Sequence, residues 1–368
     1  MGNMARSPRI AVTGLGVLCA LGDSPEAVFQ RMAKNETGIK PVTRFSTDTL
    51  HCSIAGELEP EHRRAVLADA STASMDDCAR YAVYAARQAL TDSGLIVRGS
   101  GNERPGQGAG RNGREIAAER IGLVLGTCNG GILSLEKQWN LDRLDIANTA
   151  NYPFYQQGDD AAKALGLAGP VAVVNTACAA SANAVGFAAD LIRWGYADVM
   201  LAGGSDPLSH SVFAGFNVLR ALNPEPCSPF GSRFGLNLGE GAAFVVLERM
   251  DLALARGARI YAEFCAYGLS NDAYHETAPH PEGAGIARAV RMALAQGRTE
   301  RGQIGYINAH GTGTTANDRA ELAGLRSVFG DMRVPISSSK AYFGHNLGAA
   351  AAVELVTALY AIGKGYAP

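Results

Sequence analysis

The sequence predicts an α/β fold in which a mixed, largely parallel sheet is covered by helices. Strand-like apolar runs alternate with segments of helical spacing through residues 1–250, which finish in strands. Glycine is abundant, at 44 of 368 residues, which suits many tight turns between strands and helices. A similar order of elements recurs over residues 251–368. The chain is therefore expected to consist of two related halves, 1–250 and 251–368.

Composition and charge exclude several classes of function. The chain is 47% hydrophobic and 18% charged, with a formal net charge of −2, which is ordinary for a soluble globular enzyme. This balance argues against a nucleic-acid groove or a polybasic membrane anchor. We expect no membrane-spanning run and no signal peptide, and hence a cytoplasmic protein. The seven cysteines are scattered without a CxxC pair, so neither a disulfide framework nor a metal site is expected.

Cap and turn signals divide the first half into elements. Asp23 or Ser24 can cap a helix that has Pro25 in its first turn and continues to Ala33. A second amphipathic helix is expected over residues 79–92, ending near Gly94. The other elements expected here are a strand at 9–16, a mobile Gly- and Arg-rich loop at 98–114, and strands at 121–125, 171–174, 198–204 and 239–247.

The stretch around Cys178 has the pattern of a nucleophile at a strand-to-helix turn. Residues 171–174 form a short apolar, mostly β-branched run, and helical spacing begins at Ser181. Unpaired backbone N–H groups and the positive end of the helix dipole lie at such a turn, and both favour the thiolate. Cys178 therefore suits an activated nucleophile, whereas this stretch by itself fits a small buried thiol equally well.

The second half places further polar residues at the ends of expected elements. These elements are a strand at 259–267, a helix at 286–295, a strand at 304–308, a helix through 321–325 and a long Ala-rich helix at 347–362. His310 follows a strand, and Lys340 and His345 precede the last helix. Sites in α/β sheets gather at the carboxyl ends of strands, so these residues can converge on Cys178. A thiolate with two imidazoles suits acyl-thioester chemistry, because imidazole N–H groups can stabilise a developing oxyanion.

Three segments resemble the active-site motifs of the β-ketoacyl-acyl-carrier-protein synthases, the elongating condensing enzymes of the thiolase superfamily. In that family's order and approximate spacing they are Thr176-Ala-Cys-Ala-Ala-Ser181, Ala309-His-Gly-Thr-Gly-Thr314, and Lys340 with Gly344-His-Asn-Leu-Gly-Ala349. The resemblance covers nearly the whole chain. It implies a thiolase-like fold, with duplicated βαβαβαββ halves in a layered α-β-α-β-α arrangement.

The resemblance also implies an acyltransferase that performs a decarboxylating Claisen condensation in fatty-acid, polyketide or polyene biosynthesis. Cys178 would accept the acyl chain, while His310 and His345 would promote decarboxylation of malonyl-acyl carrier protein and stabilise the enolate that gives the β-ketoacyl product. Lys340 would hold the site electrostatically, with Glu321 as its carboxylate partner. Thr312 and Thr314 would bind the phosphopantetheine arm, and Asn129 would line the acyl pocket. No metal or redox cofactor is implied, because the carrier protein's phosphopantetheine carries the substrates.

Two departures from the family pattern bear on activity. The family continues after the Ala-rich helix with two strands and a loop that supplies a second oxyanion N–H, whereas this sequence stops at Pro368. The second half is therefore expected to lack its last strands, and losing one oxyanion donor costs on the order of 10²–10³ in rate. Asn129 stands where fatty-acid elongases usually have an apolar residue, which disfavours a plain saturated chain and points to polyketide or polyene synthesis.

Other interpretations follow from the same residues. The absent C-terminal loop fits an inactive scaffold, a chain-length partner of an active synthase, or one half of a split protein, although such partners typically lack a nucleophile like Cys178. A thiolase would have a second cysteine in place of His345. For a condensing enzyme, the expected partners are an acyl carrier protein and either a second copy of the chain or a related subunit, with no nucleic acid.

Overall fold

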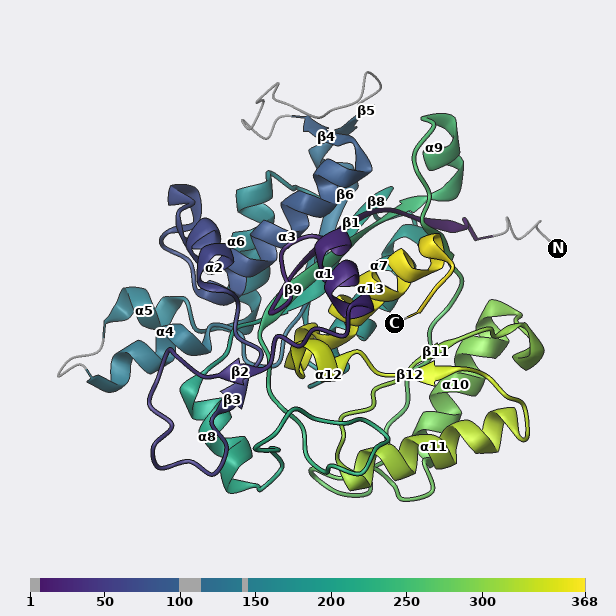
Figure 1. Ribbon diagram of the computed structural model, residues 1–368. Helices are drawn as coiled ribbons and strands as arrows, with labels where there is room; N and C mark the ends of the chain where they lie inside the picture. The colour runs from purple at the N-terminus through teal and green to yellow at the C-terminus, as the bar shows by residue number, and fades with distance from the viewer. Residues whose placement is uncertain (1–6, 99–113, 141–144, 368) are drawn as a thin grey trace.

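A six-stranded mixed sheet lies at the centre of the computed structural model, which describes residues 7–98, 114–140 and 145–367 (Figure 1). Neighbouring strands are parallel from β8 through β6 to β7, and antiparallel at the β8–β9, β9–β1 and β1–β10 pairs. In spatial order the strands are β10 (Ala262–Phe264), β1 (Ile10–Cys19), β9 (Gly241–Arg249), β8 (Val199–Asp206), β6 (Ile121–Gly126) and β7 (Val171–Val174). The predicted mixed α/β architecture is confirmed, but the expectation of a largely parallel sheet was wrong, because three of the five strand pairs in this sheet are antiparallel.

Helices cover both faces of this sheet (Figure 1). One face packs against α3 (Asp77–Ser93) and α6 (Phe154–Leu165), and the other against α7 (Ala180–Arg193) and α13 (Ala350–Lys364). Because both faces are covered, every residue of β1, β6 and β8 is buried, and these strands read as continuous rather than alternating apolar runs. Two large apolar clusters fill the two interfaces, and together they form the core.

Local signals set the helix ends as predicted. Ser24 caps α1 (Pro25–Ala33) by accepting a hydrogen bond from the backbone N–H of Ala27. Helix α3 ends at Gly94, which adopts the left-handed conformation that glycine tolerates best. The predicted ends of these two helices are therefore confirmed to within two residues.

The second half contributes a smaller structure beside the main sheet. Helices α10 (Ala284–Gly297) and α11 (Thr315–Phe329) pack together next to a parallel pair formed by β11 (Ile307–Asn308) and β12 (Ile336–Ser337). The strands predicted at 259–267 and 304–308 are therefore much shorter than expected, and β10 joins the main sheet beside β1. An apolar run becomes a strand only where a partner backbone pairs with it, which sequence spacing does not reveal.

Shorter elements complete the described chain. The helices are α2 (Pro60–Leu67), α4 (Ile132–Glu136), α5 (Ile146–Ala150), α8 (His210–Val218), α9 (Met250–Ala255) and α12 (Lys340–Phe343), and the strands are β2 (Lys40–Pro41), β3 (Ile54–Ala55), β4 (Leu95–Arg98) and β5 (Arg114–Ala117). Within the predicted loop at 98–114, Arg98 and Arg114 instead belong to the parallel β4–β5 pair, and residues 99–113 lie outside the described residues.

One helical stretch, Leu347–Lys364, is long and apolar enough to cross a membrane by length and composition. The expectation that no run reaches that length was therefore wrong. This stretch is 61% buried within the protein, and it contains Glu354, which pairs with Lys340. A mostly buried helix with an ion-paired carboxylate fits a core helix of a soluble protein.

Candidate active site

Cys178 lies in a strained turn between β7 and α7. The residue before it, Ala177, has φ of +51°, in the left-handed region that a residue with a side chain rarely adopts. The backbone of Gly126 packs directly against the start of α7 and so holds the turn in place. A Cβ on Gly126 would lie 2.4 Å from the backbone nitrogen of Ser181. The sulfur of Cys178 is partly exposed and lines a cavity. The local sequence thus places the thiol in the strand-to-helix turn, just before the first residue of α7, as expected.

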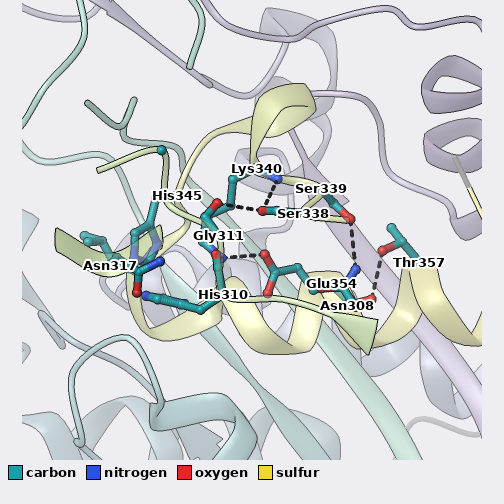
Figure 2. A network of polar contacts seen from close by, with 12 residues as sticks. Asn308, His310, Gly311, Asn317, Ser338, Ser339, Lys340, His345, Glu354 and Thr357 are labelled. Carbon is teal, nitrogen blue, oxygen red and sulfur yellow. Dashed lines mark hydrogen bonds and ion pairs between the residues drawn. The ribbon is translucent and has the colours of Figure 1, made fainter. Parts of the chain in front are cut away.

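The structure brings both predicted histidines to this thiol. The sulfur of Cys178 and ring nitrogens of His310 and His345 all lie within 4.8 Å of one another. The two imidazole rings have centroids 5.3 Å apart and meet edge to face, at an interplanar angle of 84° (Figure 2). His310 follows β11 and His345 follows α12, so the cluster combines three separate segments of the chain.

Neighbouring groups favour the thiolate of Cys178. A hydrogen bond from the Cys128 thiol is the largest influence and lowers the pKa of Cys178 well below its ordinary value. Hydrogen bonds from His310 and His345 lower it further, against the opposing effect of burial. The same interaction with Cys178 raises the pKa of Cys128. The interaction therefore favours the thiolate at Cys178 and the protonated thiol at Cys128.

His345 is held as a neutral imidazole with a defined tautomer. Its Nδ1 accepts a hydrogen bond from the backbone N–H of Leu347 at 3.1 Å, so the ring proton resides on Nε2. Burial lowers the pKa of His345, which keeps the ring uncharged at neutral pH. Its backbone N–H donates to the carbonyl of Asn237 at 2.7 Å, and its carbonyl accepts from Gly239 at 2.9 Å. The structure thus supplies an oriented N–H donor beside Cys178.

The predicted pairing of Lys340 with Glu321 is wrong. The Nζ of Lys340 donates to Oε1 of Glu354 at 2.5 Å and to the carbonyl of His310 at 2.6 Å (Figure 2). Glu321 instead accepts the backbone N–H groups of His310 at 2.7 Å and Gly311 at 2.8 Å. Helix α13 lies across the site and presents Glu354 to the ammonium group of Lys340. Both carboxylate oxygens of Glu321 are already hydrogen-bonded to the backbone of the turn that carries His310. Both carboxylates hold His310, but in different ways.

Sequence reasoning missed three contributors to this site. Cys128 interacts with the nucleophile, and Glu354 pairs with Lys340. Asp206 joins the loop after β6 to the loop that follows His345. Two of them, Glu354 and Asp206, carried a signal. Glu354 is an acidic residue in the first turns of an otherwise apolar, Ala-rich helix, and Asp206 ends a buried apolar strand at the carboxyl edge of the sheet. An acidic side chain in such surroundings is rarely buried without partners.

Asp206 is fully buried and accepts four hydrogen bonds. Its Oδ1 accepts from the Thr127 hydroxyl at 2.8 Å and from the Asn129 N–H at 3.0 Å. Its Oδ2 accepts from the N–H groups of Cys128 at 2.8 Å and Gly348 at 2.7 Å. Burial is the dominant influence and raises the pKa of Asp206 to about 7. This carboxylate ties the loop after β6 to the loop that carries His345.

The thiol and both histidines open into a cavity of about 1760 Å³. Thr312 and Thr314 also line it, and their hydroxyls lie 2.9 Å apart, where a polar arm could contact both. Asn129, expected in the acyl pocket, is not part of this lining. Its Nδ2 is buried and has no hydrogen-bond partner among the described residues. The thiol and imidazoles in a cavity of this size suit covalent acyl transfer.

Comparison with protein families gives matches along the whole chain. The family model "Beta-ketoacyl synthase, N-terminal domain" matches residues 7–253, and "Beta-ketoacyl synthase, C-terminal domain" matches residues 261–368. A 3-oxoacyl-[acyl-carrier-protein] synthase 2 from Synechocystis is 34% identical, over 100% of this chain and 88% of that protein. Nodulation protein E from Rhizobium leguminosarum bv. trifolii is 37% identical, over 98% of this chain and 88% of that protein.

Solved structures with the same fold are ketosynthases. The ishigamide ketosynthase/chain length factor is 33% identical and superposes with a TM-score of 0.88, covering 98% of this chain and 88% of that chain. A type II polyketide ketosynthase, AntDE, in complex with its acyl carrier protein AntF is 27% identical with a TM-score of 0.82, covering 98% of this chain and 87% of that chain. These likenesses extend over both halves of the chain.

Proposed function

This chain belongs to the β-ketoacyl synthase family, and on that premise we propose that Cys178 carries the growing acyl chain in a decarboxylating condensation. The protein is an acyltransferase-type condensing enzyme of fatty-acid or polyketide synthesis. It has the thiolase-like ketosynthase fold. The residue roles below are derived from the geometry of the site, and they form the proposal.

The first step loads the acyl chain. The Cys178 thiolate attacks the carbonyl carbon of an acyl thioester on the carrier protein, a new C–S bond forms, and the phosphopantetheine thiol leaves with a proton. The lowered pKa of Cys178 favours the nucleophilic thiolate. Thr312 and Thr314 lie in the same cavity and can hydrogen-bond the departing arm.

The second step makes the carbon–carbon bond. A malonyl thioester loses CO₂, and the electron pair of the broken C–C bond forms an enolate whose oxygen needs hydrogen-bond donors. The Nε2–H of His345 provides one, and the ring of His310 lies beside it to provide another. The enolate carbon then attacks the acyl-Cys178 carbonyl, and the thiolate of Cys178 leaves. Release of CO₂ drives the reaction, so this proposal invokes no metal or redox cofactor.

A single observation carries this proposal: a thiol with a lowered pKa and two imidazole rings share one cavity. A chain-length partner or scaffold would not need an activated nucleophile, so the complete cluster favours the catalytic role. The partners are an acyl carrier protein and a second ketosynthase subunit, either identical or related. Strand β7 is the outer strand of the main sheet, and Val171 is exposed along it, so we place the subunit contact there. We also propose that the protein acts in the cytoplasm.

Intact-protein mass spectrometry tests the acyl-enzyme. Incubation with a carrier protein that is loaded with an acyl group is expected to add one acyl group to the wild type. The same result is expected for Cys265→Ser, a matched control at an exposed cysteine. Cys178→Ala is expected to take none. Addition of malonyl-carrier protein should then discharge the acyl group and release β-ketoacyl-carrier protein and CO₂. Acylation that persists in Cys178→Ala would refute the proposal.

A further inference from the structure

A second thiol faces the nucleophile, and the condensation gives it no covalent role. Cys128 follows β6 and Cys178 follows β7, and these parallel strands are in register at their ends, where Gly126 pairs with Val174. The interaction between the two side chains is the largest influence on the pKa of each thiol. Two cysteines from neighbouring strands therefore meet at the reactive centre.

The backbone holds Cys128 in this position from both sides. Its N–H donates to the buried carboxylate of Asp206 at 2.8 Å, and its carbonyl accepts from Nδ2 of Asn175 at 3.3 Å. The loop after His345 presses against it, because a Cβ on Gly348 would lie 2.5 Å from the nitrogen of Cys128. The position of Cys128 beside the Cys178 turn is therefore fixed by the packed backbone.

The two thiols differ in their relation to the cavity. Both residues are partly exposed, and Cys178 lines the cavity of about 1760 Å³, whereas Cys128 is not among the residues that line it. A small solute that enters the cavity therefore meets Cys178 first. The thiolate is the form of cysteine that reacts with hydroperoxides, and Cys178 is the thiol of this pair whose charged form is favoured. Oxidation should begin at the nucleophile, with an intact thiol in contact with it.

We propose that Cys128 is a resolving cysteine that forms a reversible disulfide with Cys178 after a hydroperoxide oxidises the nucleophile. The thiolate of Cys178 attacks the peroxide, the O–O bond breaks, and Cys178 becomes a sulfenic acid while water or an alcohol is released. The sulfur of Cys128 then attacks the sulfenic sulfur, an S–S bond forms, the S–O bond breaks, and the hydroxide leaves as water with the Cys128 proton. Two electrons pass from the two thiols to the peroxide.

The disulfide would switch the enzyme off and protect its nucleophile. With both sulfurs joined, Cys178 cannot accept an acyl group, and a thiol reductant restores it. Without Cys128, the sulfenic acid has no adjacent thiol and proceeds to the sulfinic and sulfonic acids, which thiols do not reduce. Disulfide formation extends beyond the condensation and can be measured even if the proposed acyl transfer fails.

Peroxide treatment of the whole protein tests the proposal by mass. Wild type and Cys265→Ser should lose two hydrogen atoms on mild H₂O₂ treatment, and non-reducing peptide mapping should link the peptides of Cys128 and Cys178. Cys128→Ser should instead gain two or three oxygen atoms at Cys178. After reduction with dithiothreitol, condensing activity should recover roughly tenfold better in the wild type than in Cys128→Ser.

Cys128→Ala is a second variant, in case serine disturbs the buried hydrogen bonds around this loop. It should behave as Cys128→Ser does, with an unchanged circular dichroism spectrum. The proposal is overturned if oxygen atoms accumulate on wild-type Cys178 without a linked peptide. It is equally overturned if Cys178 pairs with another cysteine, or if both Cys128 variants resist overoxidation as well as the wild type.

Discussion

The two sides of the catalytic cavity are stabilised in different ways. On the Cys178 side, the nucleophile sits at the end of a six-stranded sheet whose central strands are buried on both faces. Close backbone contacts, such as the one at Gly126, and hydrogen bonds of the uncharged Asn175 and Asn183 side chains hold its turn. No ion pair within the described residues touches the Cys178 turn.

On the histidine side, the supporting sheet has only two short strands, and its apolar cluster has four buried members. His310 is positioned instead by polar groups, since Glu321 accepts its N–H and Lys340 donates to its carbonyl. Lys340 is itself buried against Glu354. A small apolar cluster cannot orient a loop, so hydrogen bonds and a buried charge pair do so. The comparison predicts that the two sides fail in different ways when mutated.

The largest effect is expected on the histidine side, from Lys340→Ala. The variant leaves Glu354 as an unpaired buried carboxylate and releases the carbonyl of His310, so it should cost about 3–5 kcal/mol of unfolding free energy. Condensing activity should fall on the order of 10²-fold, because His310 loses its position. Urea denaturation and a condensation assay measure the two effects.

The matched control is the double variant K340M/E354L, which replaces the ion pair by apolar side chains. It should recover most of the lost stability while activity stays low. If Lys340→Ala is as stable as the wild type, polar contacts do not hold this side, and the contrast between the two sides fails.

A smaller loss of stability is expected on the Cys178 side, from Gly126→Ala. The new Cβ would lie 2.4 Å from the backbone nitrogen of Ser181, so the strand end and the first turn of α7 must separate, at about 1–3 kcal/mol. Acylation of Cys178 should slow with it. Gly215→Ala, in α8 with open space around its Cβ, should be neutral or stabilising by about 0.5–1 kcal/mol. Thermal denaturation that fails to separate these two variants would contradict the role of close packing.

The smallest effect concerns Asp206, which joins the two sides, and it depends on pH. Its pKa is about 7 in the folded protein and ordinarily 3.8, so the folded state binds the proton more tightly. The stability from this group is complete below its ordinary pKa and is lost as pH rises through about 7. The stability advantage of wild type over Asp206→Asn should therefore shrink between pH 5 and pH 8 in urea denaturation. An advantage that stays constant or grows with pH would show that this carboxyl does not titrate as inferred.

The sequence by itself determined the local features of this protein. The cap at Ser24, the left-handed end at Gly94 and the strand-to-helix turn that presents Cys178 depend on residues a few positions apart, so their φ and ψ preferences and nearby hydrogen bonds decide them. The spacing of the motifs that carry His310 and His345 was enough to indicate the family, because chemistry restricts which residue types can stand there.

Only the tertiary structure decided which side chains meet. Lys340 pairs with Glu354 rather than Glu321 because α13 packs across the site, and no spacing along the chain encodes that crossing. Cys128 stands 50 positions before Cys178, yet the parallel pairing of β6 with β7 brings the two residues together, so that their side chains interact. Contacts between distant segments depend on how whole elements pack, and that is decided by the free energy of the complete core rather than by any one stretch of sequence.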